Sequence, residues 1–206
     1  PWSGRSCRGP GVGPWPERVQ NAIFAYSARG RSRATVGLRS LGRIRLMDKQ
    51  LIRDLLAGFS IETTVRESLR IERFGGLLPP GTCLYIAHVP GTNPDDTVVL
   101  AARLRAEGLE PVPHIVARRT PSLAALDTFL GRLVGEAGVK QVLVVAGDIA
   151  KGEGELDNAL QILDSGLLEK HGIRKLGVAG HPEGHRDVSE PVLRDALKRK
   201  NEYARR

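Results

Sequence analysis

Short apolar runs alternate along the chain with longer segments in which apolar residues recur at helical spacing. Apolar runs bounded by polar or glycine-containing stretches are typical of buried β-strands. Five such runs stand between residues 55 and 182, and we predict each of them as a strand. They read "LLAGFSIETT" with its strand ending at Glu62, "TCLYIAHV" (82–89), "EPVPHIVAR" reaching His114, "QVLVVAGD" (141–148) and "RKLGVAGHP".

The intervening segments predict helices, because their apolar positions recur every three or four residues and capping residues stand at their ends. "DDTVVLAARLRAEG" is closed by Gly108. "TPSLAALDTFLGRLVGEAG" has a candidate N-cap at Thr120, Pro121 in its first turn and a stop near Gly138. "GELDNALQILDSGLLEKHG" predicts one further helix, and "SEPVLRDALKRKNEYARR" predicts a last one with Ser189 as its cap.

Alternating strands and helices predict βαβ units and a parallel sheet, whose buried strands are almost continuously apolar. A polar residue stands at the end of every predicted strand: Glu62, His88, His114, Asp148 and His181. A (β/α)8 TIM barrel and a doubly wound sheet both bind their ligands at the carboxyl ends of the strands. The pattern therefore predicts where the site lies without choosing between these two α/β folds.

The number of strands limits the choice of fold. A barrel needs eight strands and about 200 to 250 residues. The chain offers five predicted strands in the 160 residues from Met47 to Arg206. It is therefore either an open five-stranded α/β domain or about the first five β/α units of a barrel.

The formal net charge of +8 resides in residues 1–46, which hold nine arginines and one acid, Glu17. The remainder, 47–206, has 22 basic and 22 acidic residues and lacks the basic footprint of a nucleic-acid binder. Because Met47 is the only methionine and directly follows 1–46, we interpret that segment as non-native upstream sequence. A transit peptide and a basic nucleic-acid-binding tail are the alternatives. We expect one folded domain, 47–206.

Localisation is predicted from what the sequence does not contain. No apolar run approaches the length of a membrane span, and no signal-peptide pattern is recognised. The two cysteines, Cys7 and Cys83, form no CxxC pair, so a zinc ribbon is not predicted. We expect a cytoplasmic protein that binds neither membrane nor nucleic acid.

Two histidines follow the last predicted strand in "KLGVAGHPEGHRD" (175–187). His181 and His185 are four residues apart, as in zinc motifs, but Pro182 and Gly184 prevent the helix that would bring both onto one face. No third ligand stands out in the sequence, and we expect no metal. A surface turn and a contact with an organic cofactor are the other interpretations.

Four motifs, "FSIETT", "GLEPVPHIVAR", "VLVVAGD" and "GVAGHPEGH", in this order and at these separations resemble the methylenetetrahydrofolate reductases. The resemblance covers about residues 56–206, and the "AGHPEGH" turn is its most specific part. It implies a (β/α)8 barrel, of which this chain supplies about five β/α units, holding FAD. The implied reaction reduces 5,10-methylenetetrahydrofolate to 5-methyltetrahydrofolate with NADH or NADPH. Such an oxidoreductase serves one-carbon metabolism and methionine biosynthesis.

The resemblance also implies roles for individual residues. Glu62 matches the acid that protonates the folate nitrogen, and Asp148 matches an aspartate between flavin and folate. A carboxyl group at a strand tip suits an acid, because partial burial raises its pKa toward the working pH. Apart from the resemblance, a strand-end glutamate in solvent and a common Gly-Asp turn explain the same residues. The FAD contacts implied are His114, Ala146, Gly147, Asp148, Ala159, His181, His185 and Lys200.

Some positions depart from the family pattern. The residues after Glu62 are Thr-Thr-Val instead of Phe-Pro-Pro, Ala87 replaces a usual threonine, and Ala146 replaces a common arginine. An alternative function is therefore a catalytically incomplete flavin- or folate-binding barrel fragment that needs a partner chain. A homo-oligomer is also compatible with the sequence. A phosphate-binding barrel lyase is disfavoured, because none of the five strand ends carries a lysine.

Overall fold

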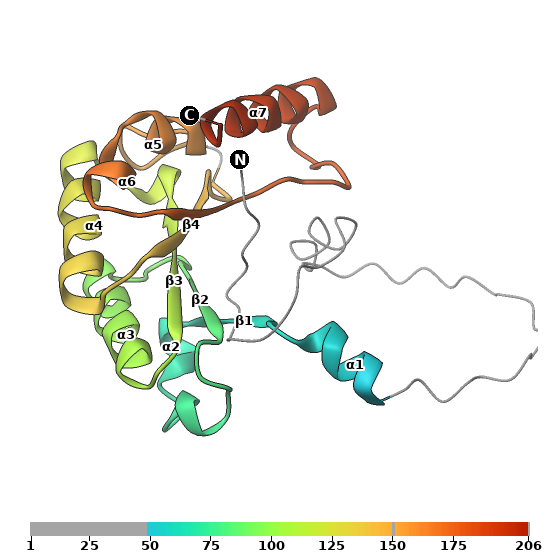
Figure 1. Ribbon diagram of the computed structural model, residues 1–206. Coiled ribbons are helices and arrows are strands. Elements are labelled where there is room, and N and C mark those ends of the chain that lie inside the picture. Colours follow the sequence, from blue (N-terminus) through green and yellow to red (C-terminus); the bar gives the residue numbers. More distant parts are fainter. Residues whose placement is uncertain (1–48, 150, 206) are drawn as a thin grey trace, which may run out of the picture.

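The computed structural model describes residues 49–149 and 151–205, so the segment 1–46 lies outside the described residues. Its centre is a sheet of five parallel strands in the order β1-β2-β3-β4-β5 (Figure 1). The strands are β1 (Ser60–Thr64), β2 (Cys83–Ala87), β3 (Glu110–Val116), β4 (Gln141–Val145) and β5 (Lys175–Val178). Spatial order thus follows chain order throughout the described sheet.

Helices precede the sheet and connect its strands. They are α1 (Lys49–Leu56), α2 (Val65–Ser68), η1 (Phe74–Gly76), α3 (Pro94–Ala106), η2 (Ala117–Arg119), α4 (Leu123–Ala137), α5 (Ala159–Asp164), α6 (Leu167–Lys170) and α7 (Glu190–Tyr203). No helix among the described residues is long and apolar enough to cross a membrane.

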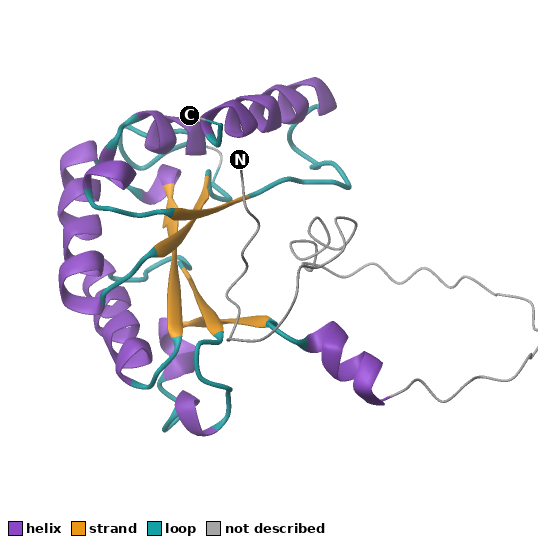
Figure 2. Ribbon diagram, viewed as in Figure 1, coloured by secondary structure: helices purple, strands orange, loops and turns teal. Residues whose placement is uncertain are grey.

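The hydrophobic core lies between one face of the sheet and the connecting helices. Figure 2 shows α3, α4, α5 and α6 along one side of the strands. Because side chains alternate between the two faces of a strand, every second strand residue enters this core. The strand residues of the core that are at most 1% exposed are Leu84, Ile86, Ile115, Val142 and Val144. Their helical counterparts include Val98, Leu104, Leu126, Leu130, Leu133, Ile162 and Leu163.

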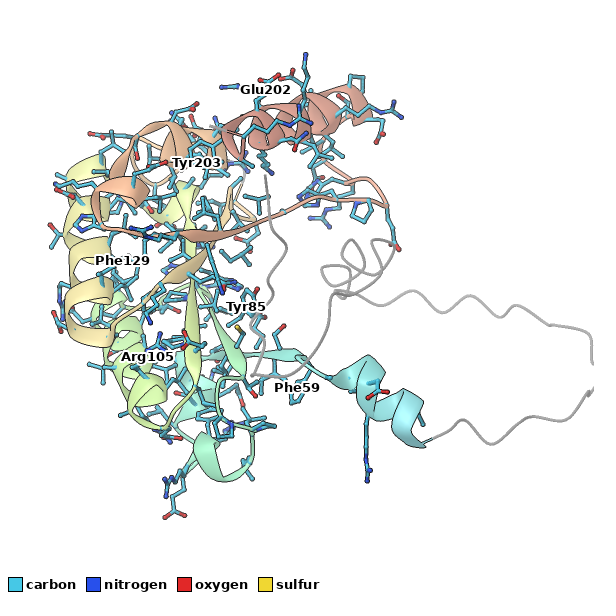
Figure 3. The ribbon with its side chains drawn as sticks, viewed as in Figure 1. Phe59, Tyr85, Arg105, Phe129, Glu202 and Tyr203 are labelled. Carbon is cyan, nitrogen blue, oxygen red and sulfur yellow. The ribbon has the colours of Figure 1, made fainter. Side chains whose placement is uncertain are left out.

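The opposite face of the sheet carries more polar and more exposed residues. Glu62 and Tyr85 are register partners there, and Gln141 is also partly exposed. Figure 3 shows Tyr85 on the side of the strands away from α4, whereas Phe129 lies on the helix side. The described sheet is therefore covered by helices on one face, and its strand order lacks the reversal that defines a doubly wound sheet.

The five strands form where the apolar runs predict them, and two helix stops are confirmed. Gly108 and Gly138 have φ of 84° and 58°, the left-handed conformation with which glycine ends helices. Ser189 is the N-cap residue of α7, although its side chain makes no capping hydrogen bond.

Three local predictions are wrong. Leu55 and Leu56 belong to α1 instead of a strand, and Gly58 at φ 76° turns the chain before β1, which extends past Glu62 to Thr64. The segment 159–170 forms two short helices, because Gly166 adopts a left-handed φ of 73° between them.

The third error concerns the start of α4. The Thr120 hydroxyl donates to the carbonyl of Val116, which closes η2. Ser122 is the N-cap instead, and its Oγ accepts a hydrogen bond from the amide of Ala125 at 3.1 Å. Pro121 therefore precedes the N-cap residue and does not belong to the first turn of α4.

Substitution within α4 tests the position of the core. Leu130 is fully buried, whereas Leu123 on the same helix is 40% exposed. We expect Leu130→Ala to lower the free energy of unfolding by about 2–5 kcal/mol, because it leaves a cavity. Leu123→Ala should change it by no more than about 0.5 kcal/mol. Urea denaturation monitored by circular dichroism measures both, and equal effects would contradict this assignment of the buried face.

Candidate functional site

A polar cluster occupies the helix-free face of β1, β2, β3 and β4. Nε2 of His114 lies 3.2 Å from Oε2 of Glu62, although β2 separates their strands. The Tyr85 and His114 rings meet edge to face, with centroids 6.1 Å apart. The Tyr85 hydroxyl is hydrogen-bonded to Gln141. Side chains from four consecutive strands are thus in contact across one face.

His114 is buried in a way that keeps its imidazole neutral. Burial, with a smaller contribution from the nearby charge of His88, lowers its pKa to about 4. Its Nε2 is enclosed and makes no hydrogen bond, even though the Glu62 carboxylate is close. At neutral pH the two side chains are therefore not an ion pair, and Nε2 is an unsatisfied polar atom, which is uncommon in folded proteins.

Glu62 is more accessible than its neighbour. Its side chain is 58% exposed, and desolvation by the surrounding sheet raises its pKa above the usual value for glutamate. It stands in the middle of β1, two residues before the end of the strand. An accessible carboxyl group with a raised pKa can bind a proton and pass it to a ligand on this face.

The loop after β4 is fastened to the end of β3. The amide of Arg118 donates to the carbonyl of Ala146 at 2.9 Å, and its guanidinium donates to the carbonyls of Ile149 and Asp157, each at 2.8 Å. Arg118 thereby ties both ends of the loop to η2. The backbone positions of 146–148 are consequently set by an arginine that follows the neighbouring strand.

Asp148 and Gly147 have different surroundings within this loop. Arg119, whose side chain is only 10% exposed, contacts Asp148 at 3.1 Å and Glu153 at 3.2 Å. The hydrogen bond from Arg119 is the main reason that the pKa of Asp148 is lowered, so this carboxylate is ionised. Gly147 has φ 107°, and a Cβ there would lie 2.7 Å from Cγ1 of Val116. Glycine is therefore required here for contact with β3.

A second cluster lies beyond β5. The rings of His181 and His185 meet edge to face at 5.2 Å, and His181 has a left-handed φ of 48°. Lys200 of α7 donates from Nζ to the carbonyl of Ala179 at 2.8 Å. The pKa of His181 is lowered first by burial and then by the charges of His185 and Lys200. In the described part of the chain no carboxylate pairs with the Lys200 ammonium.

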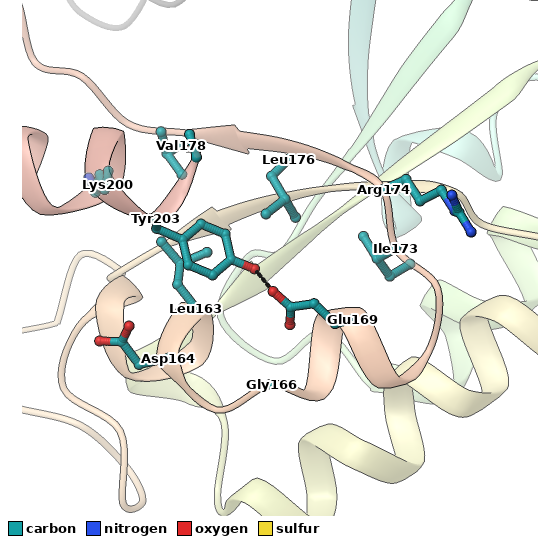
Figure 4. A pocket seen from close by; sticks show the side chains of 11 residues that line it. Leu163, Asp164, Gly166, Glu169, Ile173, Arg174, Leu176, Val178, Lys200 and Tyr203 are labelled. Atoms are coloured by element: carbon teal, nitrogen blue, oxygen red, sulfur yellow. Dashed lines mark hydrogen bonds between the residues drawn. The ribbon is translucent and has the colours of Figure 1, made fainter. Parts of the chain in front are cut away.

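Lys200 also borders a cavity of about 380 Å³ between β5 and the helices α5, α6 and α7 (Figure 4). Tyr203 crosses this cavity, and its hydroxyl donates to Glu169. Leu163, Leu176 and Val178 supply apolar walls. Burial in this setting lowers the pKa of the Lys200 ammonium.

The predicted site residues therefore fall into two groups and one exception. Glu62 and His114 are in contact. The charges of Arg119 and Glu153, which hold the Asp148 loop, shift the pKa of His88, and the charge of His88 in turn lowers the pKa of His114. His181, His185 and Lys200 form the separate cluster beyond β5. Ala159 is the exception. It is the first residue of α5, 4% exposed, and packs in the hydrophobic core.

Sequence reasoning did not assign Tyr85, Gln141, Arg119 or Glu153 to the site. Tyr85 and Gln141 stand within apolar runs, where only the strand register reveals that they share a face with Glu62. Arg119 lies 29 residues from Asp148 in the chain, and no sequence signal joins them.

The residues present fit a flavin dinucleotide only in part. The His114 ring lies on the helix-free face of the sheet, but its Nε2 is enclosed beside Glu62 and is not presented to a ligand. His181, His185 and Lys200 gather cationic or neutral donors that suit phosphate. Ala159 does not fit a direct contact through its side chain, which lies in the core. In the described residues, no three side chains of His, Cys, Asp or Glu are grouped to hold a metal ion.

No family model matches the chain.

Replacement of Gly147 tests the tight contact between the β4 loop and β3. Gly147→Ala should lower the free energy of unfolding by about 1–3 kcal/mol, because the left-handed φ and the short distance to Val116 both oppose a Cβ. Gly135→Ala is the control. Gly135 lies within α4 with open space around it, so alanine there should stabilise by about 0.5–1 kcal/mol. Chemical denaturation of both variants measures whether each substitution lowers or raises the free energy of unfolding.

The lowered pKa of His114 predicts acid sensitivity. The folded protein binds a proton at this imidazole more weakly than the unfolded chain does, so stability from neutral His114 is complete above about pH 6.5. It should be lost as pH falls toward about 4, by on the order of 3 kcal/mol. His114→Phe should remove this part of the pH dependence. Unfolding curves of both proteins between pH 4 and 7 measure it, and parallel curves would refute the assignment.

Proposed function

We propose that this chain forms the FAD- and folate-binding part of a methylenetetrahydrofolate reductase-like enzyme. The observation that carries the proposal is that Glu62, whose pKa is raised, lies 3.2 Å from the ring nitrogen Nε2 of His114 on an accessible sheet face. That nitrogen makes no hydrogen bond. These are two of the residues on which the sequence resemblance rests. The proposal includes a tetrahydrofolate-type substrate, NADH or NADPH as electron donor, and a cytoplasmic setting.

The fold proposed is a (β/α)8 barrel with five of its units in this chain. Strands in sequential order with helices on one face are the arrangement that closes into such a barrel. In that fold the polar, helix-free face becomes the barrel interior. The edge strands β1 and β5 each pair with one neighbour among the described residues, which leaves the other edge of each for further strands.

Each proposed site residue then has a definite task. FAD, when bound, would supply the hydride that originates from the nicotinamide. Glu62 gives its proton to the folate nitrogen, so that the five-membered ring opens and its carbon can accept the hydride. Asp148 stays ionised beside Arg119 and contributes negative charge near the reacting groups. His181, His185 and Lys200 would hold the phosphates.

The experiment that tests this proposal separates the two half-reactions. Glu62→Gln keeps the size of the side chain but removes its acid. It should leave reduction of bound FAD by NADH or NADPH intact. It should slow oxidation of the reduced flavin by methylenetetrahydrofolate by about 10²–10⁴-fold, the usual contribution of a general acid. Stopped-flow absorbance of the flavin follows both steps.

Glu67→Gln is the matched control. Glu67 lies on α2, half exposed and paired with Arg70, and belongs to neither cluster. Its variant should show wild-type rates in both half-reactions. A full chain that takes up no FAD would contradict the proposal.

The second candidate is a flavin- or folate-binding fragment that needs a partner chain. The unpaired edges of β1 and β5 favour it, since exposed strand edges invite pairing. Flavin absorbance that elutes with the chain in size-exclusion chromatography only after a second polypeptide is added would support this candidate.

A further inference from the structure

We infer that Arg119 is a positioning residue, whose guanidinium holds the Asp148 carboxylate in one place at the carboxyl end of β4. This inference rests on the proposed function, in which Asp148 contributes negative charge near the reacting groups. It adds how that carboxylate is kept in place in a chain that has Ala146 where the family pattern commonly has arginine. The guanidinium beside Asp148 comes instead from η2, directly after β3.

The two ion pairs of Arg119 span the loop that follows β4. One guanidinium nitrogen lies 3.1 Å from Oδ1 of Asp148, and the other lies 3.2 Å from Oε1 of Glu153. The Arg119 side chain is 10% exposed, whereas those of Asp148 and Glu153 are 78% and 58% exposed. A guanidinium presents its donors in a rigid planar fork. The buried arginine therefore fixes two carboxylates that a ligand can still reach.

Backbone hydrogen bonds fix the segment that carries Arg119. The amide of Glu153 donates to the carbonyl of Arg118 at 2.7 Å, and the amide of Arg118 donates to the carbonyl of Ala146 at 2.9 Å. The loop after β4 is thus bound to η2 on both sides of Asp148. The Arg119 side chain consequently starts from a backbone whose place relative to this loop is set independently of the ion pairs.

Burial of the guanidinium is the reason that these ion pairs matter. A pair between two exposed side chains contributes little, because water screens both charges. A cation removed from water needs anionic partners, because an unpaired buried charge is strongly unfavourable. Asp148 and Glu153 are the carboxylates that pair with Arg119 among the described residues. Arg119 therefore holds Asp148 more firmly than an exposed arginine could.

A double-mutant cycle in the full chain tests the inference, with stopped-flow absorbance of bound FAD as the readout. We expect Asp148→Asn and Arg119→Gln each to slow oxidation of the reduced flavin by methylenetetrahydrofolate about 10- to 100-fold, because a group misplaced by about 1 Å costs up to about 10²-fold. The double variant should be within about twofold of Asp148→Asn, because Arg119 acts through Asp148. Effects that multiply would overturn the inference.

Two further variants complete this kinetic test. Arg119→Lys keeps the positive charge and should be faster than Arg119→Gln. Arg132→Gln is the matched control, because Arg132 likewise bridges two carboxylates, Asp95 and Glu136, but lies in the helix layer and belongs to neither cluster. It should leave both half-reactions at the wild-type rates. A loss in Arg132→Gln equal to that in Arg119→Gln would show an effect on stability alone and would contradict a positioning role.

Nuclear magnetic resonance of the full chain without FAD or folate gives a second readout. The ¹³C shift of the Asp148 carboxyl carbon follows its proton dissociation constant. Arg119→Gln should lower this constant about twofold to fivefold, because a largely exposed carboxylate loses a cationic donor. Arg132→Gln should leave it unchanged. If Arg119→Gln does not fold, the ¹⁵N shift of Arg119 Nε in Asp148→Asn measures the same contact, and an unchanged shift would overturn the inference.

The two readouts distinguish failure of the inference from failure of the proposed function. If the Asp148 constant responds to Arg119→Gln while Asp148→Asn leaves folate reduction unaffected, the proposed role of Asp148 fails and its fixation by Arg119 stands. If Asp148→Asn slows the reaction and Arg119→Gln does not, the positioning role of Arg119 is refuted and the proposed function stands.

Discussion

The contact between one face of a parallel sheet and a single layer of helices is the constraint on which the rest of this structure depends. Leu84 and Ile86 of β2 and Val142 and Val144 of β4 are completely or almost completely buried against that layer. Burial of apolar surface supplies the main favourable free energy of folding. That contact requires every second strand residue to be apolar, although the other face also carries buried apolar residues such as Val112 and Leu143. Because no helix of the described residues covers the opposite face, it is partly released from the requirement to be apolar.

That release explains how a glutamate, a histidine and a tyrosine can meet in the middle of a sheet. Glu62 stays accessible because no helix covers it, and its pKa rises only through partial desolvation. His114 sits deeper and is neutral. The contrast between an accessible carboxyl group and a buried imidazole separates their protonation behaviour, as acid–base sites require. The same sheet therefore holds the hydrophobic core on one face and an accessible polar cluster on the other.

The loops at the strand ends are held by arginines that belong to the neighbouring strand. Arg118 binds backbone carbonyls of the β4 loop, and Arg119 binds the carboxylates of Asp148 and Glu153. Gly147 permits this loop to approach β3 closely. A rigid connection of this kind lets a surface loop carry a carboxylate in a fixed place. The cluster of His181, His185 and Lys200 is supported separately by α7, which packs mainly on α5.

The apolar runs alone determined that the chain forms five strands separated by helices. They did so because these strands are apolar over most of their length, whereas the helices repeat apolar residues every three or four positions. The runs misplaced two polar residues, since Glu62 lies in the middle of β1 and His114 inside β3, and neither stands at a strand end. Only the tertiary structure decided that Glu62 touches His114, that Tyr85 and Gln141 share their face, and that Ala159 belongs to the core. These contacts join residues far apart in the chain, and strand register, which aligns them, is set by packing against the helices.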